Sequence, residues 1–140
     1  MTTNVLTQWS ALHRKLAGLS AALQAPNEPA GWLPPTDVVE DAHGCVVRME
    51  LAGVARADVC VRLEGRALVV EGLRRPPVCA GARFRQLEME YGPFRRVVPL
   101  PDSVAGRRAT AALAEGVLEI ILPRSRRPMS DKKVMVVMNG

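Results

Sequence analysis

The sequence predicts an all-β protein folded as an antiparallel sandwich. Between residues 36 and 123, apolar side chains recur at every second position in short runs, such as 45–51 and 59–63. Side chains of a strand point alternately to the two faces of a sheet, so this period indicates half-buried strands. Short turns join the runs and no helical pattern intervenes, which excludes the helical crossovers of a parallel sheet and favours two packed antiparallel sheets.

Turn sequences separate the predicted strands. The clearest alternating runs are 45–51, 59–63, 68–71 and 118–122. The segments that connect or precede strands are rich in Gly, Asp, Pro and Ser, and they are 41–44, 52–53, 64–66, 101–103 and 115–116. These residue types adopt turn conformations at low cost, so the boundaries of the strands are marked as well as their interiors.

Residues 1–24 have a helical rather than a β period. Their apolar residues follow one another in steps of 4, 3, 4, 3 and 4, and they are Val5, Trp9, Leu12, Leu16, Leu19 and Leu23. This spacing places all six on one face of a helix over about residues 4–24. The stripe predicts either a helix that packs on its own domain or on a second copy, or an arm that contacts other proteins.

Two further segments flank the predicted sandwich. Residues 25–35 contain three separate proline sites and a glycine, which predicts an extended linker in which Trp32 docks elsewhere. Residues 124–140 begin as a charged tether and end in an apolar run at 134–138. A short apolar strand without a partner promotes aggregation, so we expect it to dock on a sheet edge.

No catalytic or cofactor site can be identified. The chain lacks the phosphate-binding loops and the serine elbow that mark common enzyme classes. Its two histidines are isolated, so we expect neither a metal site nor any cofactor. The three cysteines fit reduced thiols in the cytoplasm, although nearby arginines leave a redox role open for Cys79 beside that of a bystander thiol.

The charge pattern gives little support for nucleic-acid or membrane partners. The 19 Lys and Arg against 14 Asp and Glu leave a net charge of +5, and several arginines occur in pairs. Acidic residues interleave with them and no aromatic stacking series accompanies them, which favours solubilising charge. No run approaches the roughly 18 apolar residues of a membrane span, and the first residues do not resemble a signal peptide.

Four short blocks of the sequence stand out together. They are a Gly-Val-Leu strand ending in Leu-Pro, a Gly-Pro-Phe-Arg strand, an Ala-Gly-Val turn and a Val-x-Val tail motif, at 111–123, 91–101, 51–59 and 134–136. In their order and spacing along the chain these blocks resemble the small heat-shock proteins, the family of the α-crystallin domain. Three departures are visible. Ala52 replaces the usual Pro, Glu115 replaces the usual Asn or Asp, and valines replace both isoleucines of the tail motif.

The resemblance implies an immunoglobulin-like sandwich of seven to eight strands and a function as an ATP-independent holdase. Residues 83–90 would form a strand that reaches a second copy and makes a dimer, using Phe84, Leu87 and Met89. The arm and the tail would join dimers into larger oligomers that bind unfolded clients. Val134 and Val136 of the tail would dock in a groove lined by Val59, Val61, Leu63, Leu113 and Leu118.

Two other classes remain open on the sequence alone. One is an adaptor or co-chaperone of the same sandwich type with one fixed partner. The other is a basic nucleic-acid-binding module. Protection of several unrelated proteins from aggregation, without nucleotide, separates these classes from a holdase.

Overall fold

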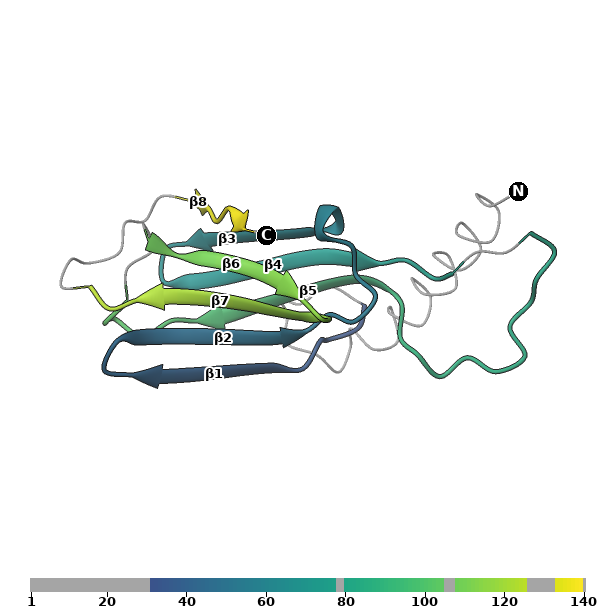
Figure 1. Cartoon of the computed structure of the whole chain (residues 1–140), viewed down its shortest axis with the longest axis horizontal. Helices are drawn as coiled ribbons and strands as arrows, with labels where there is room; N and C mark the ends of the chain where they lie inside the picture. The colour runs from purple at the N-terminus through teal and green to yellow at the C-terminus, as the bar shows by residue number, and fades with distance from the viewer. Residues whose placement is uncertain (1–30, 78–79, 105–107, 126–132, 140) are drawn as a thin grey trace.

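The computed structural model describes residues 31–77, 80–104, 108–125 and 133–139, which form two β-sheets around one core (Figure 1). The first sheet has the order β1 (Thr36–Asp41), β2 (Gly44–Glu50), β7 (Val117–Pro123), β6 (Thr110–Ala114) and β9 (Met138–Asn139). The second has the order β5 (Gly92–Pro99), β4 (Ala67–Arg74), β3 (Val59–Glu64) and β8 (Val134–Met135). The predicted all-β sandwich is therefore confirmed.

The core is built by the alternation that the sequence displays. In the first sheet the inward side chains of β2 and β7 are fully buried, and they include Val47, Met49, Leu118 and Ile120. In the second sheet β3 and β4 contribute Val61, Leu63, Leu68 and Val70, all at most 2% exposed. Each such side chain stabilises the fold by roughly 1.5–3 kcal/mol when fully buried.

One short strand pair departs from the antiparallel pattern of the sandwich. All hairpin pairs are antiparallel, as expected, but β9 pairs with β6 in parallel, with Ala111 opposite Met138. The expectation rested on the absence of crossover helices within residues 36–123. β9 comes from the tail, so its direction is set by how the tail crosses the sandwich and not by a hairpin or a helix.

The turn between β6 and β7 has an uncommon backbone. Glu115 has a φ of 53° and Gly116 a φ of 77°, and the two residues directly join Ala114 to Val117. Positive φ at both central residues is the type I′ geometry, whose twist matches that of the flanking strands. Glycine adopts this conformation freely, whereas Glu115 is strained by its Cβ.

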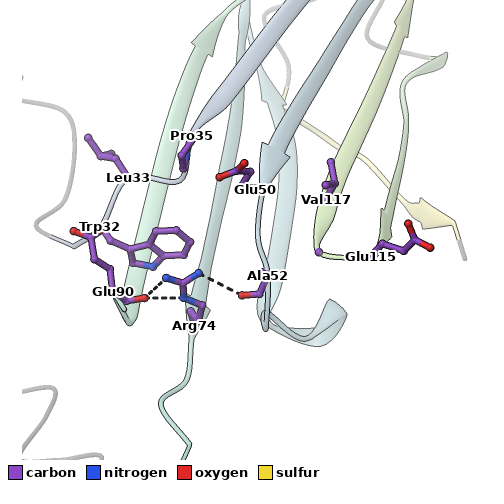
Figure 2. A pocket seen from close by; sticks show the side chains of 10 residues that line it. Trp32, Leu33, Pro35, Glu50, Ala52, Arg74, Glu90, Glu115 and Val117 are labelled. Carbon is purple, nitrogen blue, oxygen red and sulfur yellow. Dashed lines mark hydrogen bonds between the residues drawn. The ribbon is translucent and has the colours of Figure 1, made fainter. Parts of the chain in front are cut away.

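Trp32 fastens the segment before β1 to the second sheet (Figure 2). Its indole N–H donates to the carbonyl of Gly92 at 3.1 Å, and its ring meets Phe94 edge to face at 5.4 Å. The guanidinium of Arg74 lies 3.8 Å from the ring centroid of Trp32 and donates to the carbonyls of Glu90 and Ala52. The core therefore extends to Trp32, within the predicted linker.

The two flanks of the sandwich differ. On one flank the edges are β1 and β5, and on the other the edges of β6 and β3 are covered by β9 and β8. Val38 of β1 lies opposite the buried Val47 and so faces the interior, yet it is 47% exposed. The inner face of β1 is therefore incompletely covered by the second sheet.

Candidate functional site

The tail occupies the open side between the two sheets (Figure 1). β8 pairs antiparallel with β3, with Val134 opposite Leu63 and Met135 opposite Arg62. The backbone N–H of Val136 then donates to the carbonyl of Val61 at 3.0 Å. Two residues later β9 pairs with β6, so one short segment forms backbone hydrogen bonds with both sheets.

The side chains of the tail alternate between the core and solvent. Val136 is 8% exposed and belongs to the core cluster, which Val134 and Met138 also contact. Met135 and Val137 point outward and are 61% and 75% exposed. An extended strand produces this alternation, so the two valines of the motif face the core together.

The five residues predicted to line the docking groove differ in how near they lie to the tail. Val61 and Leu63 are buried on β3, directly beside the tail, and Val59 and Leu113 are partly buried against the same core. Leu118 is fully buried on β7, one strand further from the tail than Leu113.

Two groups that contact the tail were not predicted from the sequence. Ala111 of β6 is 1% exposed opposite Met138, and the Arg56 guanidinium donates to the carbonyl of Met138. The only sequence signal for Ala111 was its position in the alternating run before the turn. No feature of the sequence pointed to Arg56, because 82 residues separate it from the Met138 carbonyl that accepts its hydrogen bond.

An ion-pair network lies on the outer face of the second sheet beside the tail. Arg62 pairs with Glu64 at 2.6 Å and also with Glu71, which pairs in turn with Arg95. Lys133, just before β8, lies 3.4 Å from Glu64. The hydrogen bond from Arg62 holds the pKa of Glu64 below its usual value, and Lys133 acts in the same direction. The Glu64 carboxylate thus pairs both with Arg62 on its own strand and with the residue that precedes β8.

The segment predicted to reach a second copy is exposed in the single chain. Residues 80–90 lie between β4 and β5, contain no regular strand, and are all exposed. Phe84, Leu87 and Met89 are 45%, 45% and 60% exposed. Figure 1 shows this loop projecting away from the sheets.

Some predicted features lie outside the described residues. They include the whole arm, with its stripe of Val5, Trp9, Leu12, Leu16, Leu19 and Leu23, and also Cys79. Cys45 and Cys60 are free thiols, and burial, with a smaller contribution from Glu40, raises the pKa of Cys45. Over the described ranges no cluster of three potential metal ligands occurs. No helix of that part is long and apolar enough to cross a membrane.

Comparison with known proteins identifies one family. The Hsp20/alpha crystallin family model matches residues 37–137. The chain is 32% identical over 113 residues to Spore protein SP21 of Stigmatella aurantiaca, covering 80% of this chain and 66% of that protein. It is 31% identical over 99 residues to a probable 15 kDa heat shock protein of Leptospira interrogans, covering 71% of this chain and 75% of that protein. The chain therefore spans about two thirds to three quarters of the length of these relatives.

Solved structures give the same result for the fold. The hspA protein of Xanthomonas axonopodis is 33% identical with a TM-score of 0.62, over 68% of this chain and 96% of that one. A small heat-shock protein of Xylella fastidiosa is 30% identical with a TM-score of 0.64, over 74% and 95%.

Proposed function

Because this chain belongs to the Hsp20/alpha crystallin family, we propose that it is an ATP-independent chaperone that binds partly unfolded proteins and prevents their aggregation. The observation that carries the proposal is the family match across residues 37–137, which includes the sandwich and the tail. The proposal involves no catalytic step, no cofactor and no nucleic-acid or membrane partner. It places the protein in the cytoplasm, where free thiols such as Cys45 and Cys60 stay reduced.

Apolar surface for clients is present on the sandwich as well as on the tail. Val39, Val46 and Ile121 lie opposite one another across three neighbouring strands on the outer face of the first sheet. Val39 and Ile121 are 55% and 43% exposed. Exposed apolar residues grouped in this way are typical of surfaces that bind other proteins.

We further propose that two copies pair through the loop at 83–90 and the edge of β1. Among the described residues β1 is an edge strand of the first sheet and has a half-exposed Val38, and the loop supplies Phe84, Leu87 and Met89. Adding a strand to a sheet edge satisfies the backbone groups and buries alternate side chains. The first half of the loop complements β1 in charge, because β1 carries the exposed Asp37, Glu40 and Asp41 and the loop begins with Arg83 and Arg85, whereas its second half carries Glu88 and Glu90.

Larger assemblies are proposed to form when tails dock on neighbouring copies. Burying Val134 and Val136 is worth at most about 3–6 kcal/mol. Ordering each tail residue costs about 1–2 kcal/mol of backbone entropy. One tail therefore binds weakly and releases often, while several tails in one assembly hold it by multivalency. The same groove serves a tail from its own chain or from a neighbour.

The arm is the second proposed contact with clients and with other dimers. Its stripe includes Leu12, Leu16 and Leu19, and changing all three to Ser removes about 1.5–3 kcal/mol of potential burial at each position. We expect smaller assemblies and weaker client protection. If both are unchanged, the arm is only a local packing element.

The proposed function is tested by light scattering with at least three unrelated, heat-unfolded clients and no nucleotide. The expected result is suppression of aggregation of all of them at near-stoichiometric amounts. Protection of one client alone would instead indicate an adaptor with a fixed partner. Absence of protection combined with salt-sensitive binding of DNA or RNA would indicate a nucleic-acid-binding module.

A further inference from the structure

A shallow cleft of about 520 Å³ lies at the end of the sandwich where the described chain begins (Figure 2). Its volume is within the range of about 300–1,000 Å³ that is typical of ligand sites. The apolar lining comes from the segment before β1, the turn after β2 and the start of β7, and it consists of Trp32, Leu33, Pro35, Ala52 and Val117.

Three exposed carboxylates surround this apolar lining, from Glu50, Glu90 and Glu115. None of their side chains forms an ion pair with another residue of the described ranges. Arg74 supplies one positive charge, but its guanidinium is already engaged by Trp32 and by two backbone carbonyls. Three negative charges against one leave the cleft acidic, so a fitting occupant is apolar and positively charged.

We propose that the cleft binds the part of the chain's own arm around Arg14 and Lys15. These are the two charged residues among the first 27, which contain no Asp or Glu. Lys15 follows Leu12 by three positions and precedes Leu19 by four. On the predicted helix such residues are neighbours, so one side of the arm presents leucines beside a positive charge.

The point where the described chain begins makes this contact accessible to the arm. Gly31 directly precedes Trp32 and Leu33, which themselves line the cleft. Twelve residues separate Gly31 from Leu19, and an extended residue spans about 3.3–3.6 Å, so the arm can fold back onto the cleft. A tether of this length gives an effective concentration in the millimolar range, at which a weak contact is occupied.

Docking of the arm would cover its leucine stripe and withhold it from clients until the arm is released. This consequence rests on the proposed function, whereas the docking itself does not. An intact chain that protects no client can still hold its arm in the cleft, and a chaperone can work with the cleft empty.

Zero-length cross-linking of the full-length protein tests the docking directly. A water-soluble carbodiimide activates a carboxylate, which then forms an amide with a lysine in contact with it, and the carbodiimide leaves as a urea. The chain has only three lysines, Lys15, Lys132 and Lys133. We expect mass spectrometry to find Lys15 joined to Glu50, Glu90 or Glu115. Lys133 joined to Glu64, its ion-pair partner at 3.4 Å, serves as the internal positive control.

A matched pair of variants controls for non-specific charge effects. Glu50→Gln with Glu115→Gln should lower the total yield of links from Lys15 at least threefold. Asp37→Asn with Asp102→Asn removes the same charge from exposed positions outside the cleft and should leave the yield unchanged. The proposal is overturned if Lys133 joins Glu64 while Lys15 joins none of the three cleft residues, or if the two double variants behave alike.

Mixing ¹⁴N- and ¹⁵N-labelled subunits before cross-linking separates the chain's own arm from that of a neighbour. Links within one chain carry a single label, which is the expected result. Links of mixed label would contradict the proposal, because they would assign the cleft to the arm of a second copy.

Discussion

Glu115 adopts a strained backbone conformation that lowers the stability of the fold. Over the described ranges it is the only residue other than glycine with a positive φ, at 53°. The left-handed conformation costs a residue with a Cβ roughly 1–2 kcal/mol relative to glycine. The family resemblance indicated this position, because Asn or Asp, which tolerate the conformation better, usually occupies it.

We therefore expect Glu115→Gly to raise the free energy of unfolding by about 1 kcal/mol. For a domain of this size, this corresponds to a rise in Tm of about 4–8 °C, measured by circular dichroism. Ala114→Gly is the control, because Ala114 ends β6, and glycine in a strand costs about 0.5–1 kcal/mol. A fall in Tm with Glu115→Gly would show that the Glu115 side chain stabilises the turn more than its backbone strains it.

The pair of Asp58 and Arg75 links stability to pH. Both oxygens of Asp58 accept hydrogen bonds from Arg75 at 3.0 Å, and these bonds hold the pKa of Asp58 below its usual value. Because the folded pKa is the lower one, the stabilisation is complete above the unfolded pKa, about 3.9. It is lost as the pH falls through the folded pKa.

Asp58→Asn should accordingly lower the Tm at pH 7, and this loss should shrink as the pH falls through the folded pKa of Asp58. Thermal melts at half-unit pH intervals between 2 and 7 measure this difference. The control is Asp102→Asn, whose ion pair with Arg66 is 77% and 72% exposed and should contribute little. An equal loss at every pH would show that Asp58 acts through packing and not through its charge.

At the scale of elements, the tail contains its own control. Val134 and Val136 point into the groove, whereas Met135 and Val137 point to solvent. We expect Val134→Ser with Val136→Ser, or a stop after Asp131, to yield mainly dimers with an intact sandwich. Native mass spectrometry measures the shift, and the β signal in circular dichroism should not change.

Met135→Ser with Val137→Ser changes two neighbouring side chains and should preserve the assembly. Persistence of large assemblies in the Val134→Ser, Val136→Ser variant would mean that the arm alone holds them. Loss of assembly in both double variants would mean that overall apolarity, rather than the groove contact, is what matters.

The loop at 83–90 and β1 give a charge-exchange test of the dimer. Arg83→Glu with Arg85→Glu should weaken dimers at low salt, because the loop would then face the acidic β1. Adding Asp37→Arg and Glu40→Arg should restore them. Deletion of 83–90 should leave a folded monomer, as measured by light scattering. A dimer that survives the deletion would exclude this loop as the interface.

Elements with a clear period could be predicted from the sequence, and contacts between distant segments could not. The strands at 45–51 and 118–122 follow from alternation, which local side-chain burial imposes. Trp32 was expected to dock, but its contact with Arg74 joins segments with no common pattern. The parallel pairing of β9 depends on how the tail crosses both sheets, for which a two-residue strand carries no signal.

At the scale of the whole molecule, the flanks determine how many neighbours a chain can join by strand pairing. Among the described strands β1 is the one long edge without proline, since β5 has Pro93 and Pro99 near its ends and β8 and β9 cover the opposite flank. Proline and short strands both discourage edge pairing.

With its tail docked, the molecule is therefore monovalent for edge pairing, and monovalent units form closed pairs that cannot grow. Release of the tail from its own sandwich frees β3 and β6 to accept a neighbour's tail and frees the tail to dock on a neighbour, which makes the same chain multivalent, as in a step-growth polymer. The average size of the population then depends on the fraction of tails docked on neighbouring copies, in the way that polymer length depends on the extent of reaction. A modest change in tail affinity would shift the whole size distribution while leaving each sandwich unchanged.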